Sequence, residues 1–118
     1  MTVEWIHHSH YTQARITGVL TDADIVPLEE VPATVERRLL VDMVGVTGFE
    51  VSLPRRISVA ERRVALNDRV AVVAPLPFVF GLCRQTALMA RVRLNENYAV
   101  FDSMSPAVAW LLGLREGE

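Results

Sequence analysis

Apolar and polar residues alternate near the start of the chain, which is the pattern of strands with one buried face. Within residues 11–18, apolar Ala14 and Ile16 alternate with polar neighbours. Residues 3–8 show a similar, shorter pattern. The two segments predict antiparallel strands joined as a hairpin about residues 9–10.

Two apolar runs later in the chain predict a different kind of strand. Residues 39–44 are apolar except for Asp42, and residues 70–74 are apolar throughout. Continuous runs of this length are typical of strands buried on both faces of a parallel sheet. With a last short strand at residues 98–101, the pattern predicts a mixed, mostly parallel five-stranded sheet.

Helix signals lie between these strands. Residues 22–37 contain two prolines, so we expect one kinked helix or two short ones there. Ser58 and Glu61 have the spacing of a capping box, which predicts a helix over residues 59–66 with Arg62 and Arg63 on its exposed side.

Two further helices are predicted after the second apolar run. Prolines introduce an apolar helix over residues 78–90. Ser105 is expected to cap a terminal helix that Gly113 ends. The sequence therefore predicts a single α/β domain over residues 1–118, with an N-terminal hairpin and about four helices.

The helix predicted at residues 78–90 is apolar around more of its circumference than one sheet buries. Its excess surface has three possible covers: a second subunit, an apolar ligand in a cleft beside the sheet, or the terminal helix with Trp110. A homodimer is the simplest of these, because Phe and Met are common in interface cores. Phe78, Phe80, Met89 and Trp110 are therefore candidates for a partner or ligand surface.

Charge and composition exclude several partner classes. The net charge is −2, so the chain has no general attraction to nucleic acid. No apolar run reaches the roughly 20 residues of a membrane helix, so membrane insertion is not expected. A single cysteine, Cys83, agrees with a reducing compartment, and we expect a cytoplasmic protein.

The sequence shows no catalytic constellation. Asp42 is the one carboxylate predicted to be buried, but no residue at a suitable spacing completes a triad or an acid–base pair. We expect Asp42 to accept hydrogen bonds in a structural role more readily than to carry a reaction. The chain is therefore predicted not to be an enzyme and to hold no cofactor.

Two clusters of polar residues are candidate binding sites. His7, His8 and His10 lie about a predicted hairpin tip without a thiolate or carboxylate set, so no metal site is predicted. Four arginines at positions 55, 56, 62 and 63 could hold an anion at the start of a helix, but they fit a solvated helix face better.

The order of predicted elements, together with the ending AVFDSMSPAVAWLLG at residues 99–113, resembles the STAS family of anti-sigma-factor antagonists and its CRAL-TRIO-like relatives. The most telling match is Val100-Phe101 followed by Ala109-Trp110-Leu111, an ending frequent among small bacterial members. The family's phosphoserine segment, Asp-Ser-Ser-Gly, falls near Glu50-Val51-Ser52, where Leu53-Pro54 replaces its glycine.

This resemblance implies a non-enzymatic regulatory or protein-interaction module. It makes Ser52 a phosphoacceptor candidate, and Asp42 and Glu50 candidates for the partner surface, which is expected near a loop over residues 46–56. The alternative implied by the CRAL-TRIO resemblance is a small carrier or sensor that binds an apolar or lipid-like ligand beside the sheet.

Overall fold

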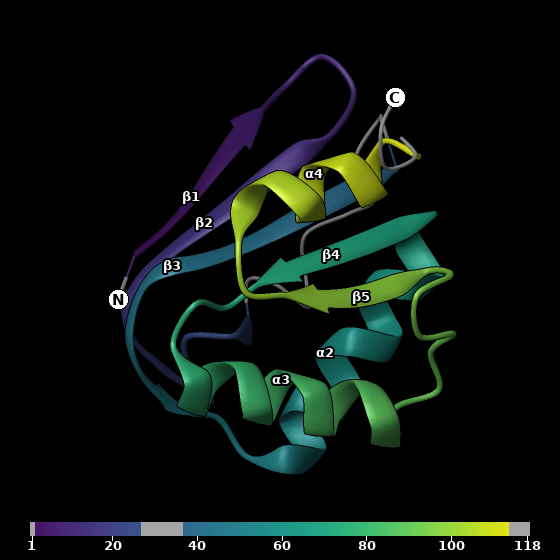
Figure 1. Cartoon of the computed structure of the whole chain (residues 1–118). Helices are drawn as coiled ribbons and strands as arrows, with labels where there is room; N and C mark the ends of the chain where they lie inside the picture. The colour runs from purple at the N-terminus through teal and green to yellow at the C-terminus, as the bar shows by residue number, and fades with distance from the viewer. Residues whose placement is uncertain (1, 27–36, 114–118) are drawn as a thin grey trace.

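Five strands form one sheet whose spatial order, β1-β2-β3-β4-β5, is also their order along the chain. The computed structural model describes residues 2–26 and 37–113. The strands are β1 (Thr2–His7), β2 (Thr12–Thr21), β3 (Arg38–Glu50), β4 (Arg69–Val73) and β5 (Tyr98–Phe101). β1 runs antiparallel to β2, whereas β2 to β5 are parallel (Figure 1). The predicted mixed, mostly parallel sheet with an N-terminal hairpin is confirmed.

Three helices lie in the described part of the chain: α2 (Leu53–Leu66), α3 (Pro77–Met89) and α4 (Met104–Leu111). Figure 1 shows α4 across one face of the sheet, and α2 and α3 together on the other side. The helix expected over residues 22–37 falls largely on residues 27–36, which lie outside the described residues. About four helices were expected, and the described ranges contain three.

The two faces of the sheet carry separate apolar cores. In β3, Leu39 and Val41 pack in a large core with α2 and α3, whereas Leu40 packs in a small core with α4. Successive strand residues point to opposite faces, so this alternation places the helices on opposite sides. Residues 39–43 and 70–73 are all buried, as predicted for strands covered on both faces.

β3 is longer than predicted, because it continues to Glu50 rather than ending near residue 44. It stays paired with β2 through two irregularities of register. Gly45 permits the close approach, since a Cβ there would lie 2.7 Å from Thr17 Cγ2. The loop expected over residues 46–56 is therefore wrong: the segment is the end of a strand followed by the start of α2.

The predicted start of α2 is also wrong. The helix begins at Leu53, with Ser52 in the N-cap position and Pro54 in the first turn, where proline loses no helical hydrogen bond. Ser58 is exposed inside the helix, so it does not form a capping box. The earlier start was missed because Leu53 to Arg56 shows no apolar periodicity.

The buried face of α2 contains arginines. Arg56, Ala60 and Arg63 are buried on it, four and three residues apart, and therefore share one side of the helix. Arg63 was predicted to be exposed and is 2% exposed. Its guanidinium donates to Asn67 Oδ1 at 3.0 Å, and this hydrogen bond compensates part of the cost of burying the polar group.

The other helix boundaries follow the local signals closely. α3 begins and ends within one residue of its prediction. α4 begins at Met104 with Ser103 in the N-cap position, two residues before the expected cap Ser105. Gly113 adopts φ +75° just after α4, which confirms its predicted role in ending the helix.

Candidate functional site

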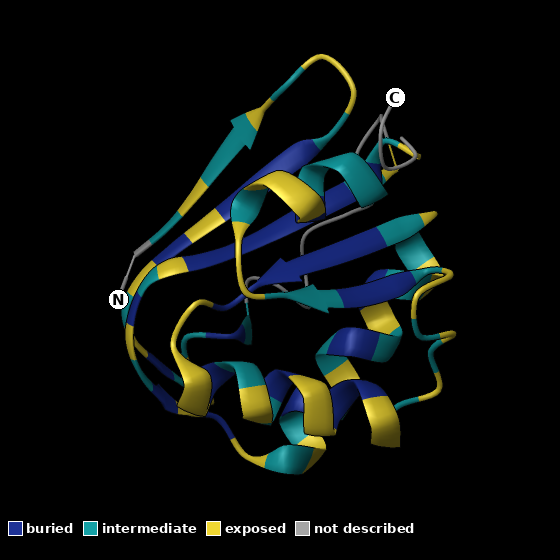
Figure 2. Cartoon of the chain, viewed as in Figure 1, coloured by how far each residue is buried: buried dark blue, intermediate teal, exposed yellow. Residues whose placement is uncertain are grey.

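The outer side of α3 carries the largest exposed apolar side chains of the described residues. Phe78, Leu88 and Met89 are 67%, 69% and 56% exposed. The opposite side of the helix, with Val79 and Cys83, packs on the large core. Figure 2 shows this division as exposed and buried bands along α3. The predicted apolar excess of this helix is thus present and is not covered by the sheet.

Four side chains follow a regular spacing, which we call the α3 stripe: Phe78, Leu82, Gln85 and Met89. Phe78, Gln85 and Met89 are exposed, whereas Leu82 is half-buried against the large core. The intervals of four, three and four residues keep them on one side of the helix. Gly81 lies beside the stripe, and a Cβ there would meet nothing within 4 Å. The stripe is therefore an open surface along which a second helix could pack closely.

The four aromatic and methionine candidates do not come together. Phe80 is half-buried and packs against the large core, with the Arg84 guanidinium 5.9 Å from its ring centroid. Trp110 lies on the opposite face of the sheet, in the small core, 5.9 Å from Phe101 between ring centroids. The terminal helix therefore does not cover α3, and Trp110 does not share a surface with Phe78 and Met89.

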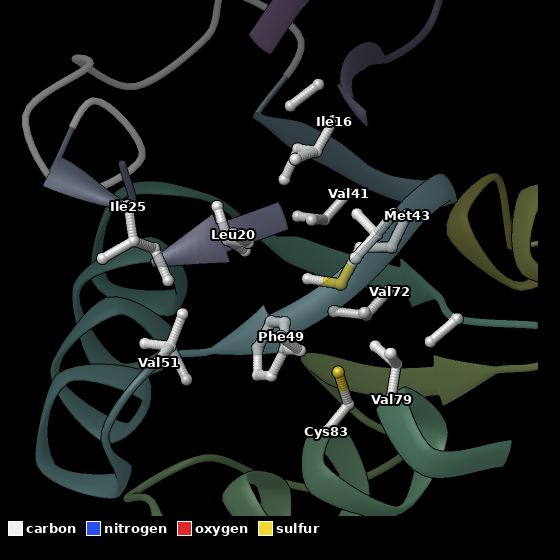
Figure 3. Close-up of a cluster of buried hydrophobic side chains, with 14 of the residues drawn as sticks. Ile16, Leu20, Ile25, Val41, Met43, Phe49, Val51, Val72, Val79 and Cys83 are labelled. Carbon is white, nitrogen blue, oxygen red and sulfur yellow. The ribbon is translucent and has the colours of Figure 1, made fainter. Parts of the chain in front are cut away.

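A small cavity lies instead between the sheet, α2 and α3. Its volume is about 40 Å³. A cavity that holds benzene has about 150 Å³, and pockets for larger ligands begin at about 300 Å³. The cavity is lined by Ile25, Val41, Met43, Phe49, Arg56, Val59, Ala60, Arg63, Val70, Val72, Cys83, Thr86 and Tyr98. Figure 3 shows Cys83 of α3 pointing towards Phe49 and Val72 of the sheet. This space does not admit a lipid-like molecule.

Asp42 lies in the middle of β3 and is buried. Its carboxylate accepts hydrogen bonds from Gln13 Nε2 at 2.8 Å and from the backbone N–H of Val44 at 3.0 Å. Arg15 Nε lies 3.7 Å from the same carboxylate. Asp42 accepts hydrogen bonds as expected, but the donors lie on β2 and on β3 itself rather than in a loop, and a part for Asp42 in a partner surface stays a prediction.

The hydrogen bonds of Asp42 extend to a histidine. Gln13 Nε2 donates to Asp42, so Gln13 Oε1 is the acceptor that faces His8 Nε2 at 2.8 Å. His8 must therefore carry its proton on Nε2. Its ring also stacks on Tyr11, with centroids 4.4 Å apart. An amide separates the histidine from the carboxylate, so the two do not form a direct acid–base pair.

Glu50 does not join Asp42. It is exposed at the end of β3, eight residues further on, about 26 Å along an extended strand. Asp42, Glu50 and a histidine therefore do not share one cleft. Among the described residues, no three histidine, cysteine or acidic side chains gather where they could hold a metal ion.

We expect Asp42→Ala to lower the free energy of unfolding by about 2 kcal/mol, because Gln13 and the Val44 N–H lose their acceptor. Urea denaturation followed by circular dichroism measures this change. Glu50→Ala in the same strand is the matched control and should change stability by less than about 0.5 kcal/mol. Equal effects of the two substitutions would contradict the role given to Asp42.

Ser52 is exposed at the start of α2, and its side chain makes no capping hydrogen bond. Its backbone N–H donates to Asp22 Oδ1 at 2.8 Å. Together with Pro54, Arg55 and Ser58, these residues line a shallow hollow. The hydroxyl is accessible, and its role as a phosphoacceptor stays a prediction.

The four arginines of the predicted anion cluster separate in the fold. Arg62 is exposed, whereas Arg56 and Arg63 are buried on the inner face of α2. Burial lowers the pKa of Arg63, and the nearby charge of Arg62 lowers it further. The four guanidinium groups therefore do not form one surface patch.

Searches of protein-family models, curated proteins and solved structures found no match to this chain. No helix within the described ranges combines the length and the apolar character needed to cross a membrane.

Proposed function

We propose that this domain is a non-enzymatic, STAS-like regulatory or protein-interaction module that self-associates through the α3 stripe. The observation that carries the proposal is the exposure of Phe78 and Met89 at the two ends of one helix face. Large apolar side chains gathered on one surface mark interaction sites more often than scattered ones do. The α/β class and the mostly parallel sheet agree with the family resemblance.

The spacing of the stripe favours a second copy as the occupant. Intervals of four, three and four residues read the same in both directions, so two antiparallel α3 helices match about a twofold axis. Phe78 then faces Met89 of the second copy, and Leu82 faces Gln85. Gln85 Oε1 already accepts hydrogen bonds from the Arg56 guanidinium, so this oxygen keeps its donors when a second copy covers Gln85.

The contribution of the stripe is tested by Phe78→Asp. We expect the dissociation constant of the dimer to rise at least about 30-fold, because two charges would enter the apolar seam. Sedimentation equilibrium over a concentration series measures this constant. Val44→Asp, which changes an exposed valine on β3, is the control and should leave the constant unchanged.

A monomeric wild-type protein at all concentrations would overturn self-association. An equal loss of dimer in the two variants would place the interface elsewhere. Circular dichroism of each variant establishes that its fold is intact.

A further inference from the structure

Arg56 of α2 extends its guanidinium group to α3, and the residue is 9% exposed. Its Nη1 donates to the Leu82 carbonyl oxygen at 2.9 Å and to Thr86 Oγ1 at 3.3 Å. Nη1 and Nη2 both lie 3.3 Å from Gln85 Oε1. All three acceptors belong to α3 and are uncharged. These bonds hold α2 against α3, but they do not neutralise Arg56.

Two requirements of this buried group are unmet. Its Nε–H has no hydrogen-bond partner. No carboxylate in the described ranges lies within ion-pair distance of Arg56. Buried charges are normally paired, since burial without a counter-ion is costly. The uncharged acceptors on α3 therefore leave Arg56 with an unused donor and a net charge.

The cavity described above adjoins this group, because Arg56 is one of its lining residues. A second buried arginine, Arg63, and the polar residues Thr86 and Tyr98 belong to the same lining, and the other walls are apolar. A volume of about 40 Å³ restricts a ligand to one or a few atoms. Mostly apolar walls exclude multiply charged anions, because these are the costliest to dehydrate, whereas a monovalent anion of the right size costs less to dehydrate.

We propose that the cavity binds a small monovalent anion, such as chloride, nitrate or formate, as the counter-ion of Arg56. Such an anion supplies both the acceptor for Nε–H and the negative charge. A water molecule supplies only the acceptor. The site lies on the inner side of α3 and touches the α3 stripe at Gln85, which accepts hydrogen bonds from Arg56.

The test compares anions at constant ionic strength, with gluconate as the reference because it is too large for the cavity. Chloride, nitrate or formate replaces gluconate stepwise, and urea unfolding is measured at each step. At a concentration 100 times its dissociation constant, the bound anion should lower the apparent unfolding constant about a hundredfold. Line broadening in ³⁵Cl nuclear magnetic resonance, reversed by nitrate, should report the same binding directly.

Arg56→Gln should abolish the anion response, and Arg84→Gln is its matched control. Arg84 is an exposed arginine of α3, so its loss changes the net charge equally but leaves the cavity intact. Ala60→Val fills part of the cavity with Arg56 retained, and should also remove the response if Arg56→Gln does not fold. No response in the wild type, which would leave only water in the cavity, overturns the proposal. An undiminished response in Arg56→Gln or Ala60→Val also overturns it.

Discussion

Raising the pH from 8 to 11 is expected to lower the free energy of unfolding by about 4 kcal/mol. Burial raises the pKa of the Cys83 thiol from 9.0 to about 12, although the nearby charge of Arg56 opposes the shift. Burial also raises the pKa of the Tyr98 phenol above its ordinary 10.0. The unfolded chain ionises both groups near their ordinary values, whereas the fold keeps them protonated. The stability is therefore fully present below pH 9 and is lost as the pH rises towards 12.

Urea denaturation at a series of pH values measures this loss. In Cys83→Ala, only the phenol contributes, so the loss by pH 11 should fall to about 1.4 kcal/mol. The comparison uses the slope against pH, because the substitution also changes the packing at every pH. An identical slope in the two proteins would show that Cys83 ionises as freely in the fold as in the unfolded chain.

Leu111→Ala is expected to lower the free energy of unfolding by about 3 kcal/mol. The side chain is fully buried in the small core beneath α4. α4 has only eight residues, and Ala107 and Leu111 are its buried ones. A short helix has little stability of its own, so most of its docking depends on this leucine.

Urea unfolding measures the total effect of this substitution, and native-state hydrogen exchange shows whether α4 detaches first. Val44→Ala shortens an exposed aliphatic side chain and should change stability by less than about 0.5 kcal/mol. A similarly small effect of Leu111→Ala would mean that α4 contributes little to covering its face of the sheet.

Elements with strong local signals could be predicted from the sequence, and elements fixed by distant contacts could not. The apolar run of β4 and the proline at the start of α3 gave boundaries within about one residue. The start of α2 was missed because the buried position of its first turns is Arg56, which hydrophobic patterning assigns to solvent, as it also does Arg63 further along. Proline in the first turn, directly after Ser52 and Leu53, was the signal that could have located it.

The candidate surface on α3 could be predicted in part, because the apolar composition of this helix is a local signal. The composition of α3 already indicated an apolar excess, and Phe78 and Met89 are indeed exposed. Which helix covers which face depends on how the chain crosses the sheet, and no local pattern records that. The sequence therefore left open whether Trp110 covers α3, and it did not indicate the buried cation of Arg56.

The agreement between strand order and chain order has a consequence for how the molecule is assembled. Each strand pairs with the strand that precedes it, so no later segment must insert between two strands already joined. A chain synthesised from its N-terminus can therefore add its strands to the sheet one at a time. Each new strand pairs with the strand before it, so only the loop between those two strands has to close. The last strand added, β5, has only four residues, and so short an edge offers little template for pairing with other chains.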